Sequence, residues 1–116
     1  MIDSFRNAFR GLFLLLKSER NFQIHLVAFI LVIIAGCVFE ITRGEWAVIL
    51  TISSVIFGLE GLNTALEKLC DEVTEERKES IRNIKDVAAG AVLVAAIISL
   101  VVGVLVFYPY VEKWLR

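Results

Sequence analysis

Long runs of apolar residues, separated by short polar segments, dominate the 116-residue chain. Three runs approach or exceed the length of about 20 helical residues that crosses the hydrocarbon core of a membrane. They cover approximately Phe22–Phe39, Trp46–Leu66 and Val87–Phe107. A soluble protein would need a far larger body around such runs to bury them. The pattern therefore predicts three transmembrane helices.

The segment before the first run, residues 4–17, is amphipathic. Its basic residues lie on one side of a predicted helix, and its apolar residues lie on another side: Phe5, Phe9, Leu12, Phe13 and Leu16. This arrangement is typical of a helix that lies in the headgroup region of a membrane. The alternative is a cytoplasmic extension of the first transmembrane helix.

The composition agrees with a small membrane protein, because 58% of the residues are hydrophobic and the mean hydropathy is +0.76. One proline and no Gly- or Ser-rich stretch leave no evident linker, so we expect a single domain over residues 1–116. The net charge of −1 gives no basic excess for nucleic acid, and no nucleic-acid partner is expected. Cys37 and Cys70 are expected near opposite membrane faces, too far apart for a bond, so we expect no disulfide between them.

Lysine and arginine are unevenly distributed between the segments outside the apolar runs. Most precede the first run or lie between the second and third: Arg6, Arg10, Lys17, Arg20, Lys68, Arg77, Lys78, Arg82 and Lys85. The connection between the first and second runs holds only Arg43. Because basic loops remain in the cytoplasm, we expect the N-terminus and residues 68–86 to share the cytoplasmic side.

Polar residues interrupt the second apolar run near its predicted cytoplasmic end. At about 100° of turn per helical residue they fall within an arc of roughly 100°, as one stripe: Glu60, Asn63, Thr64, Glu67 and Asp71. Asp71 lies at the wet end of the run, where solvation alone explains it. Glu60 lies about two turns inside, and an ionised carboxylate there needs a partner or a chemical task.

Small residues form two further stripes that predict close helix contacts, within one chain or between chains. The second run carries Ser54, Gly58, Gly61 and Ala65, and the third carries Ala91, Ala95, Ser99 and Gly103.

Several polar residues outside the stripe also have simple structural explanations. Glu19 can pair with Arg20 or Lys17, and Asp86 can be an acidic first-turn residue favoured by the helix dipole. We expect His25 to be a hydrogen-bond partner in or near the membrane. The sequence contains no Gly-rich phosphate loop, no Cys/His metal spacing and no Ser/His/Asp set.

Four ordered blocks give the chain a family resemblance from Ser4 onward: "SFRNAFRGL", "ERNFQIHL", "EGLNTALEKLCD" and "KDVAAGAVL". Together they resemble the prokaryotic diacylglycerol kinase family, which includes undecaprenol kinases. The resemblance implies a homotrimeric, all-α integral membrane enzyme with one interfacial helix and three transmembrane helices per chain. It further implies transfer of the γ-phosphate of Mg-ATP to a lipid hydroxyl, in active sites shared between subunits.

The resemblance assigns roles to the matching residues. Glu60 corresponds to the general base for the lipid hydroxyl, and Asn63 to a residue that positions the reacting groups. Glu67 and Glu19 correspond to ligands of Mg²⁺. Phosphoryl transfer needs such oxygen ligands, a cation and a base near the nucleophile.

The Lys-Asp pair of the last block corresponds to nucleotide-binding residues, here Lys85 and Asp86. The chain departs from the family pattern at Arg77 and Lys78, where many members carry an aromatic-His pair, and at Ile84, where members carry Ala. Arg77 and Lys78 are therefore given no nucleotide role.

Two functions are compatible with these observations. The first is a lipid kinase in the bacterial cell membrane that converts diacylglycerol to phosphatidic acid or undecaprenol to undecaprenyl phosphate. The second is a non-catalytic trimeric membrane assembly protein that retains the scaffold. The small-residue stripes suit either function, but the second leaves the intramembrane Glu60 unexplained.

Overall fold

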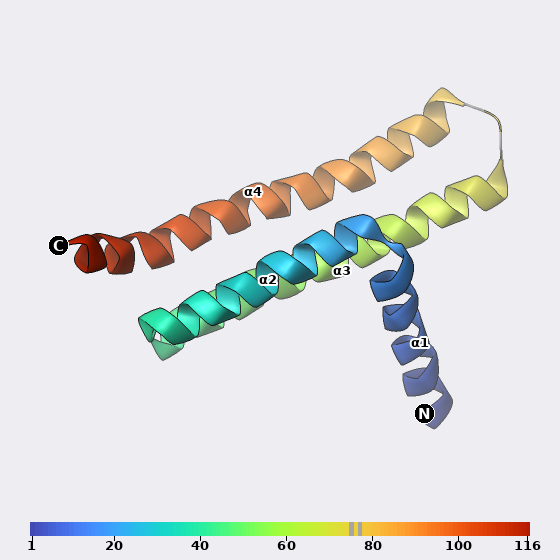
Figure 1. Ribbon diagram of the computed structural model, residues 1–116. Helices are drawn as coiled ribbons and strands as arrows, with labels where there is room; N and C mark the ends of the chain where they lie inside the picture. Colours follow the sequence, from blue (N-terminus) through green and yellow to red (C-terminus); the bar gives the residue numbers. More distant parts are fainter. Residues whose placement is uncertain (75, 77) are drawn as a thin grey trace.

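The computed structural model describes residues 1–116 except positions 75 and 77. The described residues form helices α1 (Ile2–Ser18), α2 (Arg20–Phe39), α3 (Arg43–Val73) and α4 (Glu79–Leu115). Figure 1 shows α2 and α3 as an antiparallel pair, with α4 returning alongside them and α1 pointing away. Helices α2, α3 and α4 are each long and apolar enough to cross a membrane. The predicted all-α membrane architecture is confirmed.

A single extended residue separates α1 from α2. Glu19 has φ −102° and ψ 108°, which breaks the helix and turns the chain sharply. The amide of Gln23 then donates to the carbonyl of Leu16 at 2.8 Å, so the side chain caps the end of α1. No residue of α1 is buried, and its apolar face is exposed, including Phe9 at 68%. The placement of this face in the headgroup region stays a prediction.

The hairpin between α2 and α3 is defined by a capping box and a close contact. The Thr42 hydroxyl accepts from the Glu45 N–H at 3.2 Å, and the Glu45 carboxylate accepts from the Thr42 N–H at 2.8 Å. Behind this cap, the indole of Trp46 lies directly against Gly36. A Cβ atom at position 36 would approach the Trp46 ring to 2.5 Å, so only glycine permits this packing.

Helix α4 packs along α3. At the end of the bundle near the hairpin, Ile41, Ile49 and Val106 form a small apolar core. The Tyr110 hydroxyl donates to the Glu45 carboxylate, which links the end of α4 to the start of α3. Both cysteines are free.

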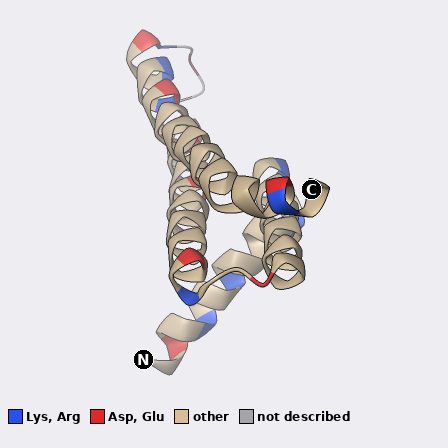
Figure 2. Cartoon of the chain, turned by 90° about the vertical axis from the view of Figure 1, so that its left-hand side faces the viewer, with Lys and Arg blue, Asp and Glu red and all other residues tan. Residues whose placement is uncertain are grey.

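The long helices carry apolar side chains outward over most of their length. Charged residues gather at the helix ends and along α1, with long uncharged stretches between them (Figure 2). Helices α3 and α4 also continue past the predicted apolar runs, to Val73 and from Glu79, respectively. The expected cytoplasmic segment, residues 68–86, is therefore largely helical, because hydropathy locates the membrane-crossing part of a helix and not its polar continuation.

Candidate active site

Glu60 lies on the face of α3 that is turned into the chain. Its exposed fraction is 3%, and the neighbouring Asn63 and Thr64 are 6% and 5% exposed. Across from it, on α2, the Nε2 atom of His25 lies 3.8 Å from a Glu60 carboxylate oxygen. That separation exceeds hydrogen-bond length, but it allows an ion pair when the imidazole is protonated. The structure thus gives the intramembrane carboxylate a partner from another helix.

Asn63 lies on α3 between Glu60 and Glu67, one turn nearer the polar end of the helix than Glu60. Its amide nitrogen donates weakly to Glu67, at 3.4 Å from the carboxylate oxygen. Its amide oxygen is buried, and no hydrogen-bond donor reaches it among the described residues. An unsatisfied buried acceptor costs about 1–3 kcal/mol, so this oxygen is suited to receive a donor from a ligand or another chain.

Glu19 is brought to the same region by the break between α1 and α2. Its carboxylate lies 3.7 Å from the Nζ atom of Lys68, which directly follows Glu67 on α3. The side chain of Leu15 on α1 lies 3.5 Å from the place where Gly61 would carry a Cβ atom. Close approach of α1 to this glycine therefore holds Glu19 beside the polar end of α3. The alternative pairing with Arg20 or Lys17 is not the ion pair that the structure shows.

Lys85, near the start of α4, reaches back to α3. Its Nζ atom donates to the Asp71 carboxylate at 2.7 Å. This hydrogen bond raises the pKa of Lys85 above its ordinary value, so the ammonium is fully charged at neutral pH. Asp86 instead lies 3.9 Å from Arg82, one turn earlier on α4. Because α4 begins at Glu79, Asp86 is not the first-turn residue that its sequence position suggests.

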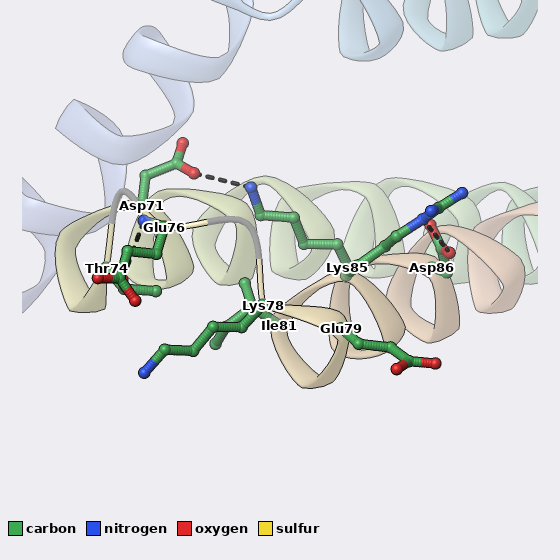
Figure 3. Close-up of a pocket in the computed structure, with 9 residues that line it drawn as sticks. Asp71, Thr74, Glu76, Lys78, Glu79, Ile81, Lys85 and Asp86 are labelled. Atoms are coloured by element: carbon green, nitrogen blue, oxygen red, sulfur yellow. Dashed lines mark hydrogen bonds and ion pairs between the residues drawn. The ribbon is translucent and has the colours of Figure 1, made fainter.

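A polar cleft of about 1020 Å³ surrounds Lys85 and Asp86, where α3 passes into α4. Figure 3 shows Lys85 extended toward Asp71, with Thr74, Lys78 and Glu79 around it. The cleft holds ammonium, guanidinium, hydroxyl and carboxylate groups, which are the groups that bind a phosphate chain and its cation.

Of the two predicted metal ligands, Glu19 forms the ion pair with Lys68, and Glu67 directly precedes Lys68 on α3. Glu67 lies on the same face of α3 as Glu60, and Glu19 reaches that end of α3 through its ion pair with Lys68. Within the described residues, no three His, Cys, Asp or Glu side chains converge as a ready cation site. Mg²⁺ is commonly held by one or two carboxylates together with substrate phosphates, so this donor set fits Mg²⁺ bound with a nucleotide.

The predicted site residues thus fall into two neighbouring groups. Glu60, Asn63 and Glu67 share one face of α3, whereas Lys85 and Asp86 lie in the cleft. In the described part of the chain, no hydrogen bond or ion pair joins the groups, although the charge of Glu67 acts on Lys85.

Sequence reasoning gave no role to Lys68 and left Asp71 as a solvated residue. Asp71 lies one turn beyond Glu67 in the same polar stripe of α3. This spacing was the sequence feature that could have indicated a role for Asp71 beside the other stripe residues. Lys68 offered no comparable signal, because its contact depends on where α1 and α2 place Glu19. Arg77, one of the positions that depart from the family pattern, lies outside the described residues.

Comparison with known proteins adds independent information. The sequence profile of the family described as prokaryotic diacylglycerol kinase matches residues 6–107. The chain is 42% identical over 106 residues to the undecaprenol kinase of Bacillus subtilis, covering 91% of this chain and 86% of that relative. It is 37% identical over 110 residues to the diacylglycerol kinase of Synechocystis sp., covering 94% of this chain and 63% of that relative. Every candidate residue described above lies inside the region that the profile matches.

Proposed function

Because the chain belongs to the prokaryotic diacylglycerol kinase family and is a lipid kinase, we propose that its preferred acceptor is undecaprenol. The 42% identity to a relative named undecaprenol kinase, over 86% of that relative, supports this choice. Diacylglycerol is the second candidate, because the relative named diacylglycerol kinase is 37% identical. Because the chain belongs to a kinase family, the alternative function, that of a non-catalytic membrane assembly protein, is not supported.

The observation that carries the proposed mechanism is the burial of Glu60, at 3% exposure, in an apolar stretch of α3. We assign this carboxylate as the general base. It takes the proton of the lipid hydroxyl while the hydroxyl oxygen bonds to the γ-phosphorus and the bond to the ADP oxygen breaks. Asn63, with its unsatisfied buried amide oxygen, positions the reacting groups. Such a depth suits a base that must meet a lipid alcohol at the headgroup boundary.

The cleft at the start of α4 is the proposed nucleotide site. The Lys85 ammonium, now held by Asp71 at 2.7 Å, would exchange this partner for a phosphate oxygen. Asp86 would contact the nucleotide as well. Glu19 and Glu67 would hold Mg²⁺, which would supply the positive charge that offsets the negative charge of the phosphates.

We place the N-terminus and this cleft on the cytoplasmic side of the bacterial cell membrane, where ATP is available. The basic residues before α2 and around the α3–α4 connection support this orientation. We also propose a homotrimer. In one chain Ser54, Gly58 and Ala65 remain exposed on a single face of α3, which suits close packing against another copy.

The direct test is phosphorylation of each lipid by the purified protein with radiolabelled ATP and MgCl₂. We expect kcat/KM for undecaprenol to exceed that for diacylglycerol by about tenfold or more, as expected for a site shaped for one acceptor. A preference for diacylglycerol would overturn the acceptor assignment and leave the lipid kinase activity standing.

A further inference from the structure

The proton that Glu60 takes from the acceptor must leave before the next turnover can begin. In the proposed reaction each lipid hydroxyl exchanges its hydrogen for a phosphoryl group, so one proton is left on the base. The Glu60 side chain is only 4% exposed, which restricts direct exchange with water. Asn63 and Thr64 are buried on the same face of α3, and neither an amide nor a hydroxyl holds an extra proton at neutral pH. A proton acceptor from another helix would therefore speed turnover.

His25 on α2 is the ionisable group that the structure places next to Glu60. Its Nε2 atom lies 3.8 Å from a Glu60 carboxylate oxygen. Glu67, the next carboxylate of the polar stripe, lies about 10.5 Å further along α3. A movement of roughly 1 Å would bring the imidazole within hydrogen-bond length of Glu60. Imidazole both accepts and releases a proton near neutral pH, so the position and the chemistry of His25 suit the transfer of this proton.

His25 also has more access to the surroundings than Glu60 has. The exposed fraction of the His25 side chain is 23%, against 4% for the Glu60 side chain. Helix α2 begins at Arg20, which is exposed, and His25 follows about 7.5 Å further along the helix. Within this pair, His25 is thus the member from which a proton can reach the polar end of α2.

The groups around His25 leave Glu60 as its main charged partner. The imidazole lines an apolar groove between α2, α3 and α4. Among the described residues that line this groove, His25 alone ionises near neutral pH, and the other polar side chains are Ser53, Ser99 and Tyr108. No carboxylate of these lining residues competes with Glu60 for a protonated imidazole. A proton that passes from Glu60 to His25 therefore produces one ion pair between α3 and α2.

We propose that His25 carries the proton of the acceptor hydroxyl from Glu60 out of the site. The inference rests on the proposed function, in which Glu60 is the general base. First, the hydroxyl proton moves to Glu60 as the hydroxyl oxygen bonds to the γ-phosphorus and the bond to the ADP oxygen breaks. Glu60 then gives this proton to the Nε2 atom of His25. The imidazolium releases it to water or to a buffer base, which restores both groups for the next turnover.

The experiment removes the imidazole and separates the first turnover from later ones. In His25→Gln an amide can hydrogen-bond to Glu60 but cannot take its proton. Ser53→Ala is the matched control, because Ser53 lines the same groove from α3. Enzyme equilibrated with the lipid that the wild type prefers is mixed with Mg-ATP and quenched after increasing times, which gives the first-turnover rate and kcat. Thermal unfolding is measured on the same preparations, and His25→Asn takes the place of a His25→Gln protein that does not fold.

We expect kcat of His25→Gln to fall by about tenfold or more, because proton release then limits turnover. The first turnover should keep its wild-type rate, because Glu60 begins it without a proton. The ratio of first-turnover rate to kcat should therefore rise by the factor by which kcat falls. Imidazole added to the buffer should restore kcat of His25→Gln, since it supplies the missing acceptor. Ser53→Ala should behave as wild type, and KM for Mg-ATP should be unchanged in both variants.

Two results would overturn the proposal. An unchanged kcat in His25→Gln would show that the proton leaves by another route. A first turnover slowed as much as kcat, with no recovery in imidazole, would show that His25 only holds Glu60 in place. Glu60→Gln, measured in the same assay, separates these results from a failure of the proposed function. Loss of its first turnover retains Glu60 as the base, whereas an undiminished first turnover would remove the base assignment itself.

Discussion

At the scale of single residues, the orientation of Glu60 is the central feature of the chain. The stripe that contains Glu60, Asn63 and Thr64 faces inward, whereas Ser54, Gly58 and Ala65, on another side of α3, are exposed. In a membrane this orientation gives the carboxylate a protein environment with His25 opposite, and it spares the carboxylate direct contact with lipid tails. Burial of three polar groups together is costly unless they are hydrogen-bonded or paired, and the Asn63 amide oxygen has no donor among the described residues.

The first prediction separates metal binding from base catalysis. Glu67→Gln removes one proposed Mg²⁺ ligand and keeps the side-chain size, so KM for Mg-ATP should rise by about tenfold. Higher MgCl₂ concentrations should restore part of the activity, and this rescue is measured by titration at fixed ATP. Glu72→Gln, at an exposed position on the same helix, is the control and should behave as wild type. Unchanged KM and Mg²⁺ dependence in Glu67→Gln would remove Glu67 from the metal site.

At the scale of helices, the contact between Gly36 and Trp46 fixes the α2–α3 hairpin. Gly36→Ala should destabilise the protein by about 1–3 kcal/mol, because the new Cβ atom forces the indole out of place. Gly90→Ala is the matched helical control, since no heavy atom lies within 4 Å of its added Cβ. That change should be neutral or stabilising by up to about 1 kcal/mol. Thermal unfolding in detergent measures both, and equal stability of the two variants would contradict the packing described here.

The contact between Tyr110 and Glu45 gives a pH-dependent prediction, and both groups lie outside the predicted membrane spans. The Tyr110 hydrogen bond lowers the pKa of Glu45 from its ordinary 4.5, with further lowering by the Thr42 N–H. The same bond to Glu45 raises the pKa of Tyr110 from its ordinary 10.0. The stabilisation is therefore present above pH 4.5 and below pH 10.0. It is lost as pH falls through the lowered Glu45 value or rises through the raised Tyr110 value.

Tyr110→Phe should accordingly lower Tm slightly at neutral pH, because the hydroxyl donor is absent. The difference from wild type should shrink at acid pH, where Glu45 is protonated in both proteins, and at strongly alkaline pH, where Tyr110 of the wild type is ionised. Tm is measured across this pH range in one detergent. A constant difference at every pH would show that the hydroxyl acts through packing and not through Glu45.

The sequence predicted the number and type of helices because three long apolar runs allow few other structures. It also predicted that Glu60, Asn63 and Glu67 share a face, since that follows from helical geometry alone. The contact between His25 and Glu60 depends on how α2 docks on α3, and the ion pair between Glu19 and Lys68 depends on the break before α2. Periodicity within one helix carries no information about either docking geometry.

At the scale of the whole molecule, the exposed small residues of α3 lead to a test of assembly. Gly58 is exposed, and no heavy atom of the same chain lies within 4 Å of its added Cβ, so Gly58→Leu should be tolerated by a single chain. If the trimer packs through this face, the variant should dissociate, as measured by light scattering in detergent. Gly11→Leu on α1, outside both small-residue stripes, is the control. Ala95 is less informative, because it is already buried within the chain at 5% exposure.

An oligomer that survives Gly58→Leu would place the subunit interface on another face. Such a result would leave the catalytic assignments intact, because the contacts of Glu60, Glu19 and Lys85 described above all form within one chain.

The central claim is that the buried Glu60 is the general base for a lipid hydroxyl, and it is tested most directly by Glu60→Gln. This change keeps the side-chain size and its hydrogen-bonding capacity and removes the basic carboxylate. We predict that kcat falls by roughly 10²-fold or more, while Mg-ATP binding, measured by equilibrium titration on the same protein, is unchanged. Undiminished kcat, or a loss of Mg-ATP binding that accounts for the whole effect, would contradict the claim.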